Sequence, residues 1–325
     1  MEKRPNNTIE ELRAEFATVR KTAIVGHLHP DGDCISSCLS LYHYLKDNYG
    51  YEADVYLEPY PTAFNMLPGT EIIRHEFEPQ VYDVVYSLDC ADADRIGTGR
   101  ELFDTAKKRV MIDHHISNPI FGDVNYVQGQ IGSACEVLYT IFEEDKIGYN
   151  TAMCLYTGMV HDTGVFQYSN VSTDTMNRAA KLIAFGIPFT DLIQKTFYEK
   201  GFNEAKASAY AISKAEQILD GFLVWSYMSK EDMDRFGVTS SELDSVVSEL
   251  RNIRGADVAV FLYETEPSVY KCSFRSNHVV NVSALAVTFG GGGHVRASGC
   301  TFYNQSPDEI ITEIVNRIPK EDYAG

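Results

Sequence analysis

Short apolar stretches alternate with longer amphipathic stretches through the first part of the chain. The short stretches have the composition of buried strands and lie at residues 22–27, 53–58, 83–89 and 109–113. The longer stretches have helical spacing and lie at residues 34–48, 133–145, 151–161 and 173–185. Strands that alternate with helices predict an α/β fold, with a mostly parallel sheet and helices on both faces. Because ligands of such sheets bind at the carboxyl ends of the strands, a functional site is expected in the loops that follow them.

The pattern changes after residue 187, where a stretch rich in helix formers begins. Residues 188–220 are predicted to form a helical linker, followed by a smaller α/β domain. This domain has strand-like stretches at 221–228, 256–264, 269–276 and 297–303, and helices from near Thr239 and at 282–289. The sequence therefore predicts a domain of residues 1–187, the linker, and a domain of residues 221–325.

Composition limits the class of protein. The chain has 325 residues, 44% of them hydrophobic and 23% charged, as is usual for a globular protein with about two domains. No stretch has the roughly 18 apolar residues of a membrane span, and the polar N-terminus does not resemble a secretory signal, so a cytoplasmic protein without membrane attachment is expected. Seven cysteines without a CxxC pair indicate reduced thiols that mostly pack in the interior.

The net charge of −18 disfavours one class of ligand. Proteins that bind long nucleic acids usually carry a basic surface, because their affinity comes from neutralising many phosphates. A small anionic ligand is still compatible with this charge if bound cations and a few arginines supply positive charge locally.

Histidine and aspartate side chains recur where the predicted strands end. The stretch GHLHPDGDCISS contains His27, Asp31 and Asp33 in an H-x3-D-x-D pattern between a strand and a helix. An Asp-Gly-Asp sequence alone is often a turn whose carboxylates accept hydrogen bonds from the backbone. The histidine at the end of the strand points into the same loop, which favours a functional cluster.

Two further strands end in charged residues. Asp89 closes the apolar strand 83–89, where a carboxylate is costly to bury without a cation or hydrogen-bond donors. The stretch VMIDHHISN ends another strand with Asp113, His114 and His115. Because neighbouring residues on a strand face opposite ways, the two histidines cannot share one role.

The stretch YTGMVHDTGVFQYSN holds a fourth pair, His161 and Asp162, where a helical pattern gives way to Thr-Gly. His161 is expected to be a packed or helix-terminal histidine. A carboxylate at position 162 is unfavourable beside a helix C-terminus unless a cation lies near. Asp92 and Asp94, on the loop after the strand 83–89, are expected to be solvated or to cap a helix.

A parallel sheet would gather six of these side chains on one edge: His27, Asp31, Asp33, Asp89, His114 and Asp162. Carboxylate and imidazole ligands without thiolates suit Mn²⁺ or Mg²⁺ better than a structural zinc ion. Six ligands are too many for one ion that must also bind substrate, but they suit two ions roughly 3.5–4 Å apart that share a carboxylate. Such a pair activates a water and clamps the oxygens of a phosphoryl transfer.

With these motifs in this order, residues 20–175 resemble the DHH phosphoesterase family, which is named after Asp-His-His. The C-terminal FGGGGHVRASGC resembles the glycine-rich motif of the DHHA1 domain. The stretches DHHISNPIFGDVNYV and LYTGMVHDTGVFQYSN are most similar to the branch of nanoRNases and 3′-phosphoadenosine-5′-phosphate (PAP) phosphatases. The resemblance implies a catalytic DHH domain, a helical linker and a substrate-binding DHHA1 domain.

The resemblance also implies a role for each candidate residue. One ion would be held by His27, Asp31 and Asp89, and the second by Asp33, Asp89, His114 and Asp162, so that Asp89 bridges them. His115 would contact the scissile phosphate, and Asp113 would orient a histidine. The implied cofactor is two Mn²⁺ ions, with Mg²⁺ or Co²⁺ as alternatives.

In the second domain, a run of four glycines allows backbone amides to approach an anionic ligand closely, although a glycine run alone is as often a flexible loop. In the family this module grips the nucleotide remote from the cut. The forked donors of an arginine guanidinium suit a phosphate group. The candidate substrate-binding residues are Arg275, Gly291, Gly292, Gly293, His294 and Arg296.

The leading hypothesis is a metal-dependent phosphodiesterase that cuts very short oligonucleotides, such as 5′-phosphorylated diadenylate (pApA), to 5′-mononucleotides. Removal of the 3′-phosphate of PAP needs the same ions and a shorter ligand. The expected partners are therefore short oligonucleotides or a nucleotide bisphosphate, with no long duplex and no membrane. Relatives of this kind are often homodimers.

Three alternatives stay open: a nucleotide sensor without turnover, a cyclic dinucleotide phosphodiesterase and a metal-dependent pyrophosphatase. The complete set of six ligands disfavours the sensor. The chain lacks the membrane and sensory segments of cyclic di-AMP phosphodiesterases with this catalytic unit. The glycine-rich module disfavours the pyrophosphatase, because pyrophosphate has no nucleoside to grip.

Overall fold

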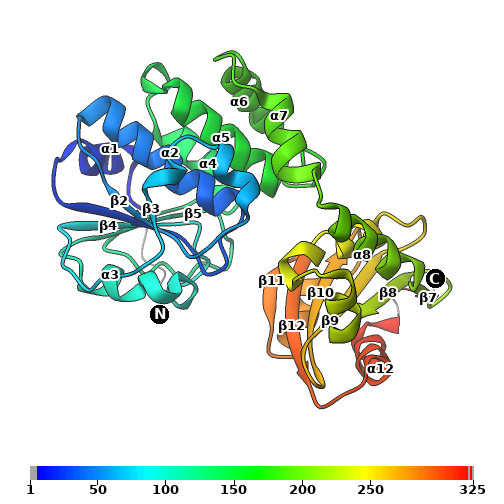
Figure 1. Cartoon of the computed structure of the whole chain (residues 1–325). Helices are drawn as coiled ribbons and strands as arrows, with labels where there is room; N and C mark the ends of the chain where they lie inside the picture. Colours follow the sequence, from blue (N-terminus) through cyan, green and yellow to red (C-terminus); the bar gives the residue numbers. More distant parts are fainter. Residues whose placement is uncertain (1–5, 321–322, 324–325) are drawn as a thin grey trace. The chain divides into compact units, whose positions relative to one another are not determined.

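The computed structural model describes residues 6–320 and 323, except for the side chains of two of them, Thr98 and His294. Two compact units make up the chain, Met1–Glu199 and Lys200–Gly325. The units therefore divide the predicted linker of residues 188–220 between them. Each unit is built around a six-stranded sheet of its own (Figure 1).

The sheet of the first unit has the strand order β3-β2-β1-β4-β5-β6, and every neighbouring pair is parallel. Its strands are β1 (Thr22–Val25), β2 (Asp54–Tyr56), β3 (Ile73–Arg74), β4 (Val84–Leu88), β5 (Arg109–Asp113) and β6 (Val124–Val127). Its α-helices are α1 (Ile9–Ala17), α2 (Gly32–Tyr49), α3 (Arg100–Thr105), α4 (Ala134–Ile141), α5 (Tyr149–Asp162), α6 (Thr173–Ile183) and α7 (Phe189–Ile193).

Helices cover both faces of this sheet, as Figure 1 shows. Successive residues of a strand face opposite ways, so Ile24 belongs to the large core under α1, α2, α4 and α5. Ala23 and Val25 belong instead to a smaller core that includes Leu102 and Phe103 of α3. The predicted parallel sheet with helices on both faces is therefore confirmed.

Helix α2 starts at the edge of the sheet where the strands end. Its N-cap is Asp31, whose side chain accepts hydrogen bonds of 3.1 Å from the backbone N–H groups of Asp33 and Cys34. It ends at Gly50, which adopts the left-handed conformation that glycine tolerates. The cap fixes where the helix starts, and so places Asp31 and Asp33 beside the strand ends.

The second unit has a mixed sheet with the order β11-β12-β10-β9-β8-β7, in which only β8 and β9 pair in parallel among the described strands. Its strands are β7 (Glu216–Ile218), β8 (Leu223–Met228), β9 (Val258–Glu266), β10 (Val269–Ser276), β11 (Gly292–His294) and β12 (Ala297–Tyr303). Its α-helices are α8 (Phe202–Ser213), α9 (Lys230–Phe236), α10 (Val246–Arg251), α11 (Val282–Val287) and α12 (Pro307–Arg317).

This smaller sheet is also covered on both faces. One core contains residues of α11 and α12, and the other contains residues of α8, α9 and α10. The helix predicted to run towards residue 220 ends at Ser213, and β7 then pairs with β8. No helix within the described residues combines the length and the apolar character that crossing a bilayer requires.

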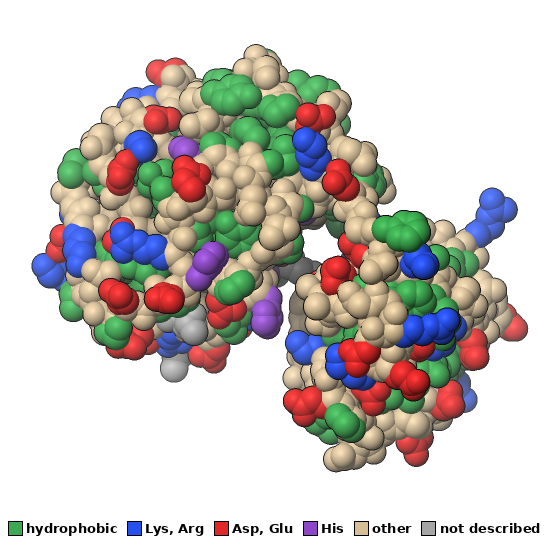
Figure 2. Space-filling model, in the orientation of Figure 1, with side chains coloured by type: hydrophobic (Ala, Val, Ile, Leu, Met, Phe, Trp, Pro, Cys, Tyr) green, Lys and Arg blue, Asp and Glu red, His purple; other side chains and the backbone are tan. Residues whose placement is uncertain are grey.

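Charge is spread over both units. Figure 2 shows acidic and basic side chains interspersed on the face that is drawn. The net charge of −18 therefore does not gather into one acidic field on that face.

Candidate metal centre

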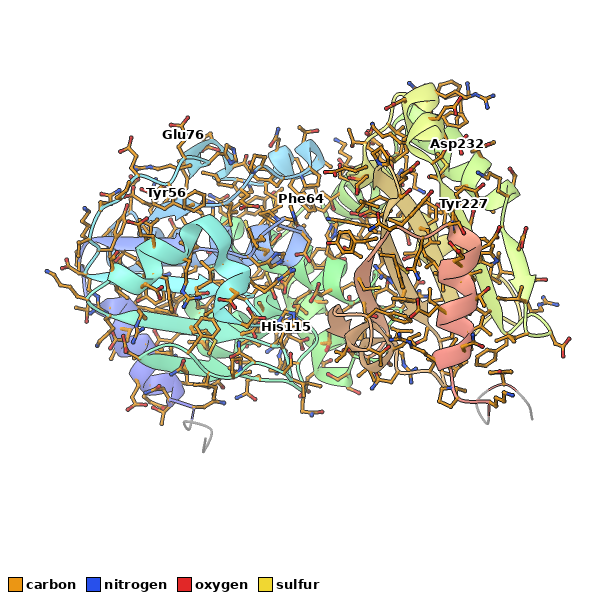
Figure 3. The ribbon with its side chains drawn as sticks, turned by 90° about the horizontal axis from the view of Figure 1, so that it is seen from below. Tyr56, Phe64, Glu76, His115, Tyr227 and Asp232 are labelled. Carbon is orange, nitrogen blue, oxygen red and sulfur yellow. The ribbon has the colours of Figure 1, made fainter. Side chains whose placement is uncertain are left out.

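Five of the candidate residues come from the ends of three central strands. β1, β4 and β5 are adjacent and parallel, so their carboxyl ends lie at the same edge of the sheet. His27 follows β1 by two residues, Asp89 follows β4 directly, and β5 ends at Asp113, with His114 and His115 after it. Figure 3 shows His115 where the strands of the first sheet end.

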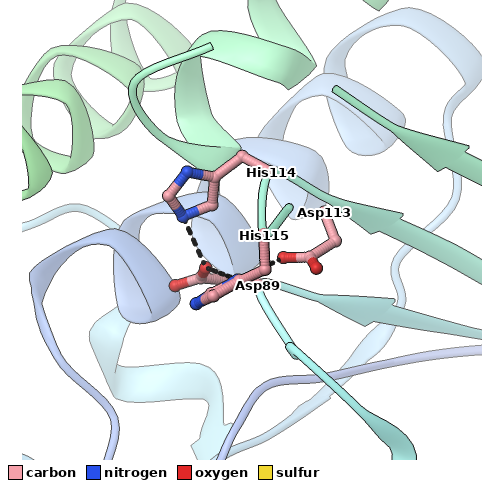
Figure 4. Close-up of side chains that lie close together, drawn as sticks. All are labelled: Asp89, Asp113, His114 and His115. Atoms are coloured by element: carbon pink, nitrogen blue, oxygen red, sulfur yellow. Dashed lines mark hydrogen bonds and ion pairs between the residues drawn. The ribbon is translucent and has the colours of Figure 1, made fainter. Parts of the chain in front are cut away.

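Asp89 lies at the middle of this cluster and is only 3% exposed. Its backbone is left-handed, with φ of 56°, a conformation that Asp tolerates better than most residues. Oδ2 lies 3.5 Å from His27 Nε2, and Oδ1 lies 3.3 Å from His114 Nε2. Figure 4 shows the imidazole rings of His114 and His115 beside the Asp89 carboxylate. Each carboxylate oxygen of Asp89 therefore faces a different histidine.

The surroundings of His27 suit a cation. Its Nδ1 lies 2.8 Å from the carbonyl oxygen of Leu28, which can only accept, so Nδ1 carries a proton. In the neutral imidazole, Nε2 then presents a lone pair towards two carboxylates, Asp31 at 3.6 Å and Asp89 at 3.5 Å. That arrangement is repulsive unless a proton or a metal ion lies between them. Ligand atoms of these three residues all lie within 4.8 Å of one another.

A second group of ligand atoms within 4.8 Å of one another comes from Asp33, His114 and Asp162. Asp162 is the last residue of α5, and its Oδ2 lies 3.1 Å from His114 Nε2. Asp33 is fully buried and accepts hydrogen bonds from the backbone N–H groups of Ala134 and Cys135 in the first turn of α4. The N-terminus of α4 thus fixes the carboxylate of Asp33.

Close packing between α2 and α5 also holds Asp33 in place. A Cβ added to Gly158 of α5 would lie 2.5 Å from Asp33 Oδ1 and closer still to Cys135 Sγ. Position 158 must therefore be glycine for this carboxylate to keep its place.

The electrostatics of the cluster call for added positive charge. Burial, reinforced by Asp89 and Asp162, raises the pKa of Asp33 well above its usual value. Burial also raises the pKa of Asp162 to about 6, although His114 opposes it. Burial lowers the pKa of His114, but the carboxylates of Asp162 and Asp89 outweigh it and raise that pKa. Four carboxylates with two imidazoles carry excess negative charge, which divalent cations neutralise, so these residues fit a metal centre.

His115 is held by a different set of contacts. Its Nδ1 lies 2.8 Å from Asp113 Oδ1. The amide of Asn118 donates to Asp113 Oδ2 at 2.6 Å and to the carbonyl oxygen of Cys90 at 2.9 Å. Asn118 is 1% exposed and was not among the predicted residues. The only sequence signal for it is its place in the DHHISN stretch.

His161 lies outside the ligand groups, as predicted. Its Nε2 lies 2.9 Å from Thr196 Oγ1, and its ring packs 4.9 Å from that of Phe64. Burial lowers the pKa of His161 to about 4. It is thus a packed neutral histidine, and the prediction is confirmed.

The remaining aspartates of the loops are also as predicted. Asp92 caps the 3-10 helix η3 (Ala93–Gly99), and Asp94 is exposed and pairs with Arg100. Neither belongs to a ligand group.

The glycine run of the second unit forms a strand. Residues Gly292–His294 make up β11, which pairs antiparallel with β12. A Cβ on Gly293 would lie 2.6 Å from the carbonyl oxygen of Ala297, and one on Gly291 would lie 2.6 Å from Cys300 Cβ. These two glycines therefore allow close approach to β12, whereas Gly292 has no atom within 4 Å of an added Cβ among the described neighbours.

The two candidate arginines both contact backbone oxygens. Arg275 Nη1 donates to the carbonyl oxygen of Phe274 at 2.9 Å. Arg296 Nη1 donates to the carbonyl oxygen of Val280 at 3.0 Å, and Nη2 donates to that of His278. The guanidinium of Arg296 thus holds the turn at 276–280. The side chain of His294, another candidate, lies outside the described part of the structure.

Asp257 holds the same turn from its other side. Its carboxylate, 6% exposed, accepts from the backbone N–H groups of His278, Val279 and Val280. Arg296 binds the carbonyl groups of the turn while Asp257 binds its N–H groups. The turn is therefore fixed by two opposite charges.

Comparison with known proteins assigns both units to families. Residues 21–159 match the model of the DHH family N-terminal domain, and residues 220–320 match that of the DHHA1 domain. The bifunctional oligoribonuclease and PAP phosphatase NrnA of Bacillus subtilis is 27% identical over 296 residues, which cover 89% of this chain and 91% of that protein. The protein of the same description from Thermus thermophilus is 27% identical, over 92% and 89% of the two chains.

A solved structure has the same architecture. The crystal structure of an exopolyphosphatase-related protein from Bacteroides fragilis aligns with a TM-score of 0.86 and 25% identity, over 95% of each chain. With both domains in order and the ligand groups at the strand ends, the chain belongs to the DHH/DHHA1 phosphoesterases, which are metal-dependent hydrolases. Within that family it is of the nanoRNase type, the branch of the NrnA-like relatives.

Proposed function

We propose that the enzyme hydrolyses very short oligonucleotides, such as pApA, to 5′-mononucleotides and removes the 3′-phosphate of PAP. The observation that carries this proposal is a pair of neighbouring ligand groups, one with Asp89 and one with His114, whose Nε2 lies 3.3 Å from Asp89 Oδ1, and His115 lies beside them. The names of the relatives from Bacillus subtilis and Thermus thermophilus, oligoribonuclease and PAP phosphatase, support the substrate class.

In this proposal His27, Asp31 and Asp89 hold one divalent cation, and Asp33, Asp89, His114 and Asp162 hold the other. When bound, the two ions lower the pKa of a water and neutralise charge on the phosphate. Oxygen and imidazole ligands favour Mn²⁺, with Mg²⁺ or Co²⁺ as alternatives.

The residues of the chain itself position the reacting groups. Burial lowers the pKa of His115, but the carboxylate of Asp113 outweighs it and raises that pKa. With Nδ1 held by Asp113, we propose that His115 in its imidazolium form donates from Nε2 to a phosphate oxygen. Asn118 fixes Asp113, and through it the direction of His115.

The second unit is proposed to bind the nucleotide remote from the cut, through Arg275, Gly291, Gly292, Gly293, His294 and Arg296. Arg296 uses part of its five N–H donors on the turn at 276–280, and its remaining donors suit a phosphate. A ligand with few phosphates fits a protein of net charge −18, because the ions and a few arginines neutralise it locally. A homodimer, a cytoplasmic location and exclusion of long duplexes are further expectations of this proposal.

A product assay tests the proposal. The purified chain with Mn²⁺ is given pApA, a long single-stranded RNA and PAP in parallel. Rapid release of AMP from pApA, with little product from the long RNA, is the expected result. Comparable rates on the long RNA would contradict the length limit, and binding of pApA without any product would favour the sensor alternative.

A further inference from the structure

Two cysteines of the second unit face each other across neighbouring strands. β10 and β12 are antiparallel, and Cys272 pairs directly with Cys300. Directly opposed residues project from the same face of a sheet, so the two thiols lie side by side.

Backbone hydrogen bonds at the two ends of this ladder define the type of pair. Asn304 N–H donates to Ser268 O at 2.8 Å, and Ser276 N–H donates to Arg296 O at 3.1 Å. Hydrogen-bonded pairs recur every two residues along antiparallel strands, which makes Cys272 and Cys300 a hydrogen-bonded pair as well. The Cα atoms of such pairs are about 5.5 Å apart. A disulfide bridges Cα atoms at about 4.4–6.8 Å, so the backbone separation is suitable.

Access to solvent distinguishes Cys300 from the other thiols of the chain. Cys300 is partly exposed, whereas the other six cysteines are buried. Cys272 is 2% exposed and packs in the core beside Phe274 and Phe302. An oxidant can therefore reach Cys300, and Cys272 is the thiol placed opposite it to complete the reaction.

We propose that Cys272 and Cys300 form a reversible disulfide between β10 and β12 when the protein meets a hydroperoxide. The thiolate of Cys300 attacks one oxygen of the peroxide, and the O–O bond breaks. Cys300 becomes a sulfenic acid, and the other oxygen leaves as an alcohol or water. The thiol of Cys272 then attacks that sulfur, the S–S bond forms, the S–O bond breaks, and water leaves. Overall, two thiols lose two electrons to one peroxide, and an added dithiol reverses the reaction.

The position of the pair links it to the glycine run. A Cβ on Gly291 would lie 2.6 Å from Cys300 Cβ, so the chain at Gly291 lies directly against Cys300. A disulfide ties β12 to β10 at Cys300, next to Gly299, which pairs with Gly292 of the glycine run, so it restricts the strand against which this run packs. This consequence rests on the proposed substrate-binding role of the glycine run, whereas formation of the disulfide does not.

The first experiment tests the disulfide alone. The reduced full-length protein is exposed to hydrogen peroxide, its remaining thiols are alkylated, and its peptides are examined by mass spectrometry. The expected product is a peptide cross-linked between Cys272 and Cys300 that dithiothreitol removes. The helical pair Cys34 and Cys38 is the internal control, because both thiols are 0% exposed and should remain alkylatable after unfolding. Oxidation of Cys300 to a sulfinic acid without the cross-link would overturn the proposal, as would prior oxidation of the buried thiols.

Variants separate the two thiols. In Cys272→Ala the sulfenic acid of Cys300 should persist and react with dimedone, a reagent for sulfenic acids. If that variant does not fold, Cys300→Ser serves instead, because its side chain is partly exposed, and it should form no cross-link. A Cys272 that is oxidised as fast in Cys300→Ser as in the parent would contradict the assigned order of reaction.

The second experiment tests the link to substrate binding. Oxidised and reduced protein are compared on pApA and on bis(p-nitrophenyl) phosphate, which has no remote nucleotide. Oxidation should raise the KM for pApA severalfold, leave the small ester unaffected, and have no effect on Cys300→Ser. An unchanged KM with the cross-link present would remove the functional link, and equal losses on both esters would place the effect at the metal centre instead. A protein inactive on pApA before oxidation would refute the proposed function and leave the disulfide result intact.

Discussion

In the first unit, side chains from the ends of β1 and β5 surround Asp89, which follows β4. In the second unit, Gly291 and Gly293 pack so closely on β12 that no side chain fits at either position. The first region consists of buried carboxylates and imidazoles whose charges demand a cation. The second consists of backbone packed closely on backbone, with arginines that bind carbonyl groups of a turn. The first region therefore depends on the charge of particular side chains, and the second on the close packing of its backbone. Substitutions should affect the two regions differently.

The largest effect is expected from Asp89→Asn. Asparagine adopts the left-handed backbone of this position as readily as aspartate, so the variant removes charge with little backbone strain. Loss of one electrostatic group commonly costs about 10²–10³-fold in rate, and loss of the ligand that we propose is shared by both ions should reach at least the upper end. Steady-state hydrolysis of pApA and calorimetric titration with Mn²⁺ measure the two consequences.

The matched control is Asp94→Asn, whose parent side chain is fully exposed and pairs with Arg100. It should keep the activity and the Mn²⁺ affinity of the parent. An Asp89→Asn variant that binds two ions like this control would refute the shared role of Asp89.

A smaller effect is expected in the second unit, from changes at Arg296. Arg296→Ala should raise the KM for pApA by about 10-fold, the equivalent of one charge-assisted hydrogen bond, with kcat nearly unchanged. Arg296→Lys should not restore the KM, because an ammonium group cannot hold the turn at 276–280 with a planar fork.

Arg235→Lys on α9 is the control for a loss of arginine in the same unit, and its KM should match the parent. Full rescue by lysine at 296 would mean that only the charge matters there. A fall in kcat alone would assign Arg296 to the reaction step and remove the contrast between the two regions.

The smallest effect is expected on stability, from His161 of the first unit. Its pKa is lowered, whereas that of His114 in the metal centre is raised. The pKa of His161 is about 4 in the folded protein and near 6.5 in the unfolded chain. As the pH falls from about 6.5 to about 4, the unfolded chain gains this proton and the folded protein does not, so stability is lost. His161 should account for a loss on the order of 1–3 kcal/mol, towards the lower end because the residue is partly exposed.

Urea unfolding of the parent and of His161→Gln, at about pH 7 and about pH 4, isolates this contribution. The parent should lose more stability than the variant on acidification. His29→Gln, at an exposed position, should follow the parent at both pH values. Equal losses in the parent and in His161→Gln would show that burial does not lower the pKa of His161.

Most of the first unit could be predicted because its strands are short apolar runs. Each of β1, β4 and β5 coincides with a predicted strand to within two residues at either end. The strands β3 and β6 were missed: β3 has only two residues, and β6 contains the polar Asn125. Of the six ligand candidates, His27, Asp89 and His114 come together because parallel strands end at one edge, a rule that needs no knowledge of side-chain contacts. The other three lie at the start of α2 or the end of α5.

Contacts between distant residues could not be predicted. Asn118 reaches Asp113 and Cys90, two strand ends, and nothing in its local sequence requires this. The same is true of Gly158, whose close approach to Asp33 joins two helices. Strand β11 could not be predicted from its glycines, because glycine is a poor strand former. In the structure, close packing against β12 requires glycine there.

Asn118 has a consequence for how this fold can diverge. The Asn118 amide bonds both the Asp113 carboxylate, which orients His115, and the carbonyl oxygen of Cys90, next to Asp89. It therefore fixes the distance between these two parts of the centre. If the second unit selects the ester, as proposed, a lineage can alter that choice without rebuilding the metal centre. A change at Asn118 would instead affect every ester to the same degree, so descendants with new substrates should retain this asparagine.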